Sequence, residues 1–173
     1  MATKRSQQIA IWIIAVVLAV GSVGFYFVVI IENNRLAEEQ QKSMEQQKPK
    51  ALPGEEAKPF EAASVTELKK DDLKGGTGEE VLAGATVKVK YMGWLPDGTI
   101  FDSSHRGGVV EEGTLNLNQV IAGWKEGIPG MKVGGKRMLL IPAAQAYGEA
   151  GSPPTIPANT PLAFIVEVTG IQK

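Results

Sequence analysis

The sequence predicts an α+β fold in which an antiparallel sheet of five or six strands wraps around one short helix. Residues 86 to 91 alternate apolar and polar side chains with a period of two, as in a half-buried strand. Residues 162 to 168 alternate in the same way near the C-terminus. A single short helical segment is expected at Ile121 to Gly127, where Gly127 and Pro129 end it.

Three further strands complete the predicted sheet. Gly135 to Ile141 is apolar enough for a central strand, and Thr114 to Leu117 is a short one. Ser64 to Lys69 is expected to be the first strand. Pro96-Asp97-Gly98 predicts a turn, because proline presets φ and glycine tolerates positive φ. These elements define a folded domain over residues 63 to 173.

The N-terminus carries a long uncharged segment. Residues 9 to 31 run for 23 positions without a charge. At about 1.5 Å per residue, a helix of this length reaches roughly 34 Å, enough to cross a hydrocarbon core about 30 Å thick. Ala19-Val20-Gly21 fits the rule for signal cleavage, but cutting there would leave an apolar new terminus. We therefore expect residues 1 to 31 to be a cytoplasmic stub and a transmembrane anchor.

Charges around this segment predict its orientation. Lys4 and Arg5 precede it and Glu32 follows it directly. The positive-inside rule then places the N-terminus in the cytoplasm and the folded domain outside. The chain is thus expected to be a single-pass membrane protein with an extracytoplasmic domain.

Residues 32 to 62 differ sharply in composition from both neighbours. Glutamine, glutamate and lysine dominate the first part, and Pro49, Pro53 and Pro59 interrupt the second. Such a segment lacks the apolar surface needed to offset the entropy of ordering. We expect a flexible linker that tethers the domain.

Composition excludes several classes of function. The chain has no cysteine and one histidine, which excludes disulfides, thiol nucleophiles and most metal centres. With 18 basic and 19 acidic residues, and no basic stripe, nucleic acid is not an expected partner. We expect no metal and no cofactor.

Aromatic residues and one carboxylate recur where a pocket could form. They are Tyr91, Phe101, Asp102, Trp124, Tyr147 and Phe164. This set offers shape and desolvation but no activated nucleophile. Rotation about the amide bond before proline is a reaction that needs no covalent step.

Several strings of residues occur together in a fixed order. They are Val89-Lys90-Tyr91-Met92-Gly93-Trp94, Asp97-Gly98-Thr99-Ile100-Phe101-Asp102-Ser103-Ser104, Val120-Ile121-Ala122-Gly123-Trp124, Ala146-Tyr147-Gly148 and Phe164-Ile165-Val166-Glu167-Val168. In these motifs the chain resembles the FKBP-type peptidyl-prolyl cis–trans isomerases over about 110 residues. The resemblance implies the fold described above and catalysis of X–Pro bond rotation.

The resemblance also implies a role for each pocket residue. Trp124 forms the floor beneath the proline ring, and the Ile121 N–H and the Tyr147 hydroxyl hold substrate carbonyls. Asp102 orients its neighbours at the pocket edge without transferring a proton. The walls and sides would be Tyr91, Phe101, Leu115, Val120, Ile121, Ile156 and Phe164.

Two segments depart from the pattern of well-known members of the family. Gly113-Thr114-Leu115 stands where eukaryotic members carry a second phenylalanine. Ser152 and Thr155 stand where bulkier residues are common. Such contacts grip large ligands and set the preference for the residue before proline, so macrolide affinity and substrate preference are left open.

The expected partners are proline-containing polypeptide clients, a macrolide inhibitor and, through the N-terminal helix, the membrane. We expect a monomer. Two alternative functions use the same pocket or surface: a module that binds proline segments without turnover, and a holdase chaperone. The holdase ranks last because Gly148 to Leu162 is too short to hold an inserted chaperone domain.

Overall fold

The computed structural model describes residues 31 to 172. Contacts divide the chain into two units, with the boundary between Gln46 and Gln47. In the first unit, residues 31 to 46 belong to an exposed helix that ends at Gln47. Among residues 31 to 172, no helix has both the length and the apolar character to cross a bilayer. The predicted transmembrane segment lies, except for Ile31, outside the described residues.

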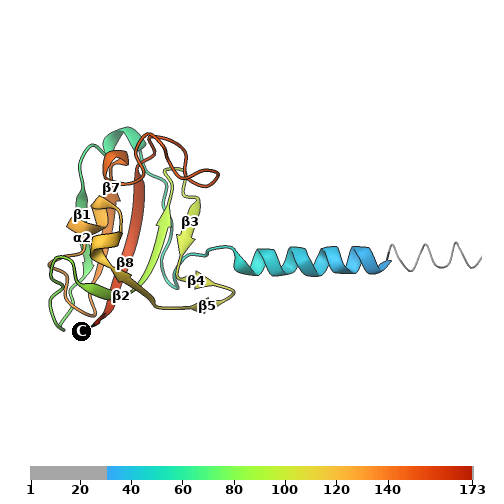
Figure 1. Cartoon of the computed structure of the whole chain (residues 1–173), viewed down its shortest axis with the longest axis horizontal. Helices are drawn as coiled ribbons and strands as arrows, with labels where there is room; N and C mark the ends of the chain where they lie inside the picture. The colour runs from blue at the N-terminus through green and yellow to red at the C-terminus, as the bar shows by residue number, and fades with distance from the viewer. Residues whose placement is uncertain (1–30, 173) are drawn as a thin grey trace, which may run out of the picture. The chain divides into compact units, whose positions relative to one another are not determined.

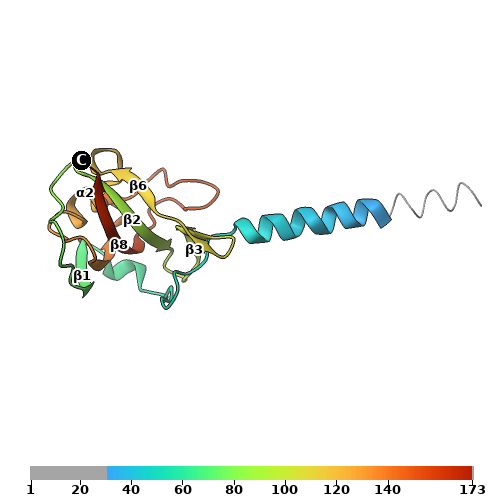
Figure 2. The same ribbon diagram turned by 90° about the horizontal axis from the view of Figure 1, so that it is seen from below.

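The second unit is built on an antiparallel sheet of six strands (Figures 1 and 2). Along the sheet run, in order, β1 (Lys69–Lys74), β7 (Lys136–Ile141), β8 (Leu162–Gln172), β2 (Thr86–Trp94) and β3 (Ile100–Ser103). A further strand, β6 (Gly113–Asn116), also pairs with β2. Separately, β4 (His105–Arg106) and β5 (Val109–Val110) form a small hairpin. The predicted antiparallel sheet is confirmed.

One face of the sheet, here called the inner face, packs against the short helix α2 (Ala122–Gly127). Alternate strand residues, including Val89, Leu139 and Val166, are fully buried there. Two glycines set the distance between helix and sheet. A Cβ on Gly123 would lie 2.4 Å from Ile141 Cγ2, and one on Gly127 would lie 2.8 Å from Leu139 Cδ2. The absence of both side chains lets α2 lie directly on β7.

The start of the domain differs from the prediction. Ala62–Ser64 forms a 3₁₀ turn, η1, and the first strand begins only at Lys69. The predicted strand at Ser64 to Lys69 is therefore wrong. Every residue of β1 is exposed, so this edge strand carries no apolar alternation that the sequence could reveal. Two more 3₁₀ turns, η2 (Leu117–Gln119) and η3 (Ala143–Gln145), occupy the connections.

The opposite, outer face of the sheet is covered by residues 50 to 60, which we call the strap. Leu52 is only 5% exposed and packs with Met92, Trp94 and Ile165. Ala51, Ala57 and Phe60 pack partly against the same cluster. The strap contains no helix or strand. It nevertheless belongs to the compact unit that begins at Gln47.

The strap corrects part of the expectation of a flexible linker over residues 32 to 62, because residues 50 to 60 are packed against the domain. Its backbone N–H and C=O groups bond to the domain, and Lys136 Nζ pairs with Glu55 Oε1 at 2.6 Å with both side chains about four-fifths buried. The few apolar residues between the prolines suffice because they meet an apolar surface already formed by the sheet. Burial of that surface offsets the entropy of ordering the segment.

Candidate active site

A hollow of about 430 Å³ opens on the inner face between β2, β3 and α2. Its lining residues are Tyr91, Phe101, Asp102, Leu115, Gln119, Val120, Ile121, Trp124, Tyr147 and Phe164. The structure thus brings together nine of the ten residues predicted from the sequence. Most of the lining is apolar, and no side chain in it is a thiol, an amine or an imidazole.

Trp124 lies at the centre of an aromatic cluster beneath this hollow. Its ring meets Tyr91 with centroids 5.5 Å apart and Phe164 with centroids 5.3 Å apart, both edge to face at 85°. Phe101 meets Phe164 edge to face at 5.5 Å. Edge-to-face contacts fix each ring by its neighbours. The hollow therefore has rigid aromatic walls and keeps its shape without a ligand.

Gly93 in β2 allows these rings to close on one another. A Cβ at this position would lie 2.4 Å from Phe164 Cε1 and 2.8 Å from Phe101 Cζ. Neither ring could keep its place beside such a methyl group. The glycine of the Tyr91-to-Trp94 motif is thus a packing requirement of the aromatic wall.

Asp102 is held by three donors at the edge of the hollow. Tyr91 Oη donates to Asp102 Oδ2 at 2.8 Å, the Ser103 N–H donates to Oδ1 at 2.9 Å, and the Arg106 guanidinium pairs with Oδ1. Burial raises the pKa of Tyr91, and the bond to Asp102 raises it further. The phenol therefore stays protonated as a donor, and the carboxylate acts as a fixed acceptor and charge.

Two groups at the rim can donate to a ligand. Tyr147 follows the turn η3 and is 40% exposed, so its ring is the most accessible aromatic ring in the hollow. Ile121 is the N-cap of α2, with extended backbone angles. The first N–H groups of a helix have no acceptor within the helix, which leaves such donors for other partners. Both groups that are predicted to donate hydrogen bonds to substrate carbonyls thus belong to residues that line the hollow.

Ile156 and Gln119 depart from the expected site. Ile156 is 3% exposed and packs in the inner core, and it does not line the hollow. Its backbone bonds with Ser152 in both directions, which draws the loop inward and closes the side chain into the core. Gln119, at the end of η2, lines the hollow although no pattern in the sequence singled it out.

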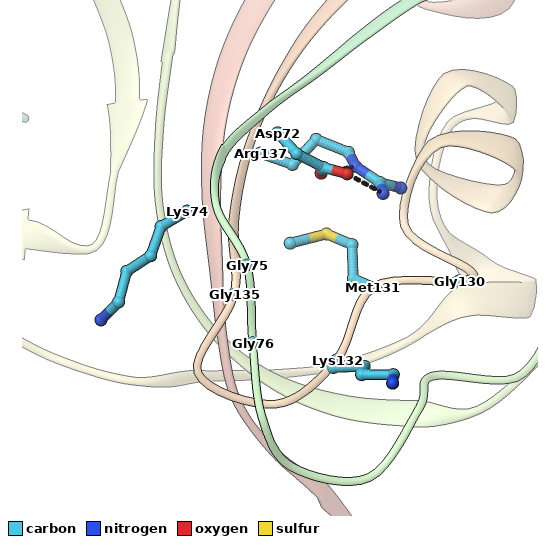
Figure 3. A pocket seen from close by; sticks show the side chains of 9 residues that line it. All are labelled: Asp72, Lys74, Gly75, Gly76, Gly130, Met131, Lys132, Gly135 and Arg137. Atoms are coloured by element: carbon cyan, nitrogen blue, oxygen red, sulfur yellow. Dashed lines mark hydrogen bonds and ion pairs between the residues drawn. The ribbon is translucent and has the colours of Figure 1, made fainter.

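A second hollow, of about 150 Å³, lies near the end of β1 and has a different character (Figure 3). Arg137 and Asp72 form a two-point ion pair there, at 2.5 and 3.0 Å, and Arg137 Nη1 also donates to Gly127 O at 2.7 Å. Lys74 and Lys132 extend away from this pair. The bond from Arg137 lowers the pKa of Asp72. Arg137 thus links α2 to the sheet, and the residues that line this hollow offer no aromatic surface.

Comparison with known proteins identifies the family and the fold. A family model for FKBP-type peptidyl-prolyl cis-trans isomerases matches residues 78–169. A peptidyl-prolyl cis-trans isomerase of Arabidopsis thaliana, FKBP15-2, is 50% identical over 90 residues, or 52% of this chain and 55% of that protein. An FK506-binding protein of Neisseria meningitidis is 46% identical over 103 residues, or 60% of this chain and 94% of that protein.

A solved structure agrees with these relatives. The crystal structure of FkpA from Escherichia coli matches with a TM-score of 0.57 and 34% identity. The match covers 82% of this chain and 60% of that one. The fold predicted from the sequence is therefore found in an experimental structure of a related protein.

Proposed function

The chain belongs to the FKBP-type peptidyl-prolyl cis–trans isomerase family, and from this premise we propose that it accelerates rotation about X–Pro bonds in polypeptide clients. The observation that carries the proposal is the rigid hollow on the inner face, lined by five aromatic side chains and by no thiol, amine or imidazole. The match spans only 55% of the Arabidopsis relative, so the proposed activity rests on the residues of this chain itself.

The proposed mechanism is desolvation of the amide. Rotation crosses a barrier of about 18 to 20 kcal/mol and takes tens to hundreds of seconds without a catalyst. A gain of about 10⁵ requires roughly 7 kcal/mol of differential stabilisation. Twisting removes the resonance that separates charge in the planar amide, so an apolar hollow favours the twisted form relative to water.

Each lining residue has a part in this mechanism. The proline ring lies on the Trp124 indole, between the walls formed by Phe164 and Val120. The Ile121 N–H and the Tyr147 hydroxyl hold carbonyls on the two sides of the rotating bond. Asp102 presents its fixed negative charge to the amide carbon at the hollow's edge, and no proton is exchanged.

An isomerisation assay on the full chain tests this proposal. The assay would follow a tetrapeptide with one X–Pro bond, in the presence of the protein and of its Trp124→Ala variant. We expect the wild-type protein to accelerate exchange and the variant to lose at least tenfold in kcat/KM. A rate equal to that of the uncatalysed peptide, from protein shown to be folded, would end the proposal.

A second variant separates catalysis from binding without turnover. A module that only recognises proline segments would bind the tetrapeptide without changing its exchange rate. Tyr147→Phe is the better probe of catalysis, because the Tyr147 ring is partly exposed and loss of its hydroxyl leaves the packing of the domain unchanged. Loss of rate with unchanged peptide affinity would identify a catalytic donor.

We propose further that the clients lie outside the cytoplasm and that the chain is anchored in the membrane. This rests on the uncharged residues 9 to 31 and on the basic residues Lys4 and Arg5 before them. Protease added to intact cells should remove the domain from residue 47 onward. Protection of the domain until the cells are lysed would contradict this orientation.

Macrolide binding is proposed with lower affinity than in family members that carry a second phenylalanine where this chain has Gly113-Thr114-Leu115. Leu115 lines the hollow here and offers less surface than a ring. Displacement of a labelled macrolide from Leu115→Phe and from wild-type protein would measure the difference. Tighter binding by the wild-type protein would refute this explanation.

A further inference from the structure

The strand that carries Phe101 and Asp102 has little support of its own. β3 is the last strand of the sheet and pairs only with β2. The pairing joins three residues of each strand, and its register shifts between Gly93 and Trp94. A short edge strand with an irregular ladder is readily displaced, and two pocket residues would move with it.

The strap binds the chain on both sides of β3. Before the strand, the Phe60 N–H donates to Pro96 O at 3.0 Å. After it, the Lys50 N–H donates to His105 O at 3.0 Å, and His105 Nδ1 lies 2.6 Å from Ala51 O. A carbonyl oxygen only accepts, so the imidazole carries its proton on Nδ1 and donates it. The strap thus holds both ends of the segment from 96 to 105, which contains β3.

His105 connects this contact to the pocket. Its backbone N–H donates to Ser103 Oγ at 3.0 Å, and the Ser103 N–H in turn donates to Asp102 Oδ1. The next residue, Arg106, pairs with Asp102 and donates from Nε to Ser103 O at 3.1 Å. Displacement of His105 would therefore move two of the three groups that orient the Asp102 carboxylate.

The strap is also anchored beneath the same pair of strands. The Leu52 N–H contacts Met92 Sδ at 3.4 Å, and Trp94 Nε1 donates to Lys58 O at 2.9 Å. Met92 and Trp94 are the β2 residues paired with the two ends of β3. The anchors therefore lie directly behind the pocket wall.

We infer that the strap is part of the catalytic unit and that His105 is a positioning residue, which holds Asp102 and Phe101 in place through its bond to Ala51. This inference rests on the proposed isomerase function of the inner hollow. It assigns a role to residues 50 to 60, which precede the segment matched by the family model. The hollow and the strap then work together, although they lie on opposite faces of the sheet.

Two substitutions of the same shape isolate the bond from His105. His105→Asn keeps an N–H donor at the position of Nδ1, whereas His105→Leu has the same branching without a donor. In the full chain we expect His105→Leu to lose roughly fivefold to twentyfold in kcat, because small displacements of positioned groups are costly. KM should change little, since Trp124 and Val120 do not contact the strap. His105→Asn should stay within about twofold of wild type.

A stability control separates positioning from general loosening. Val81→Ala removes buried side-chain volume at Val81, which is 1% exposed and does not line the hollow. At a temperature where all variants are fully folded by circular dichroism, Val81→Ala should keep the wild-type kcat. Equal kcat for His105→Leu and Val81→Ala, or an equal loss in His105→Leu and His105→Asn, would overturn the inference.

A spectroscopic readout keeps this test independent of catalysis. The Trp94 indole N–H reports the strap, through its bond to Lys58 O, and the Trp124 indole N–H reports the pocket floor. In ¹H–¹⁵N spectra we expect His105→Leu to shift the Trp94 indole and the Asp102 and Ser103 amides. Unchanged amides in His105→Leu would overturn the inference. Absence of activity in the wild-type protein together with these shifts would defeat the proposed function alone.

Discussion

The two faces of the sheet are covered in different ways. On the inner face, the helix α2 lies close to β7 and leaves an aromatic hollow beside it. On the outer face, the strap has no regular structure and follows the surface of Met92, Trp94 and Ile165. The helix has backbone bonds within itself, whereas the strap bonds to Pro96 and His105, which flank β3.

This difference explains why the helix leaves space for a ligand whereas the strap follows the surface that it covers. A helix satisfies its own backbone, so it can stand apart from the sheet at one side and leave space for a ligand. An extended segment must bond to what it covers, because buried N–H and C=O groups need partners. A hollow on the outer face lies between the strap and the sheet residues Trp94, Met138 and Ile165. The strap that forms its other wall is held in place by its own hydrogen bonds.

Removal of the strap is the most disruptive change. A chain that begins at residue 63 exposes Met92, Trp94 and Ile165, whereas one that begins at residue 47 keeps them covered. We expect the shorter chain to lose about 3 to 5 kcal/mol of unfolding free energy, a loss typical of large core truncations. Denaturation in urea measures it. Equal midpoints for the two chains would show that the strap is a passenger on the outer face.

Addition of one methyl group tests the inner face. Gly93→Ala places a Cβ 2.4 Å from Phe164 Cε1, and overpacking of this kind costs about 1 to 3 kcal/mol. Gly113→Ala is the matched control, because its Cβ would lie 3.7 Å from Tyr91 Cε1, an ordinary contact. We expect only Gly93→Ala to lower both thermal stability and the isomerisation rate. Equal effects of the two substitutions would mean that the aromatic wall can yield.

Loss of one hydroxyl sharpens the functional difference between the faces. Tyr147→Phe should lower kcat/KM about tenfold, equivalent to roughly 1.4 kcal/mol of transition-state stabilisation. The melting temperature should not move, because the Tyr147 ring is partly exposed. Leu82→Ala, at another exposed apolar residue, is the control and should leave both quantities unchanged. Unchanged kcat/KM in Tyr147→Phe would remove this hydroxyl from the mechanism.

The smallest effect concerns the ion pair between Asp72 in β1 and Arg137 in β7, whose guanidinium also donates to Gly127 O in α2. The Asp72 pKa is lowered by Arg137, so the pair stabilises the folded state above about pH 4, the ordinary range of aspartate. That contribution is lost as the pH falls through the lowered pKa. Because the Asp72 side chain is more than half exposed, we expect Asp72→Asn to cost less than about 1 kcal/mol at pH 7. The difference from wild type should vanish in acid. A difference that persists at pH 2 would contradict this account.

The strands that the sequence predicted are those with one apolar face. Residues 86 to 91 alternate, and they form part of β2. β1 could not be found in this way, because Lys69–Lys74 is exposed on both faces. The sequence of the strap predicts a linker, because its prolines and charged residues outnumber its few large apolar residues, Leu52 and Phe60. Met92, Trp94 and Ile165 carried the missing signal, since they are large apolar residues at positions that would otherwise face water.

The residues that line the inner hollow were easier to place from the sequence than the loops beside it. The family motifs carry the aromatic residues and Asp102 in order, so nine residues met as expected. Ile156 was misplaced because the inward turn of its loop depends on backbone bonds to Ser152, which leave no trace in the sequence. Gln119 was missed because a single glutamine has many uses. The side chains that line the hollow could thus be predicted from the sequence, whereas the paths of the loops could not.

Tyr91 has a consequence for alkaline conditions. Its phenol is shielded by the surrounding protein and tied to a carboxylate, so it resists ionisation even where free tyrosine would become an anion. The bond that steadies the pocket edge therefore survives in basic media. The contribution of Tyr91 to the pocket edge should therefore persist at alkaline pH until the fold itself gives way.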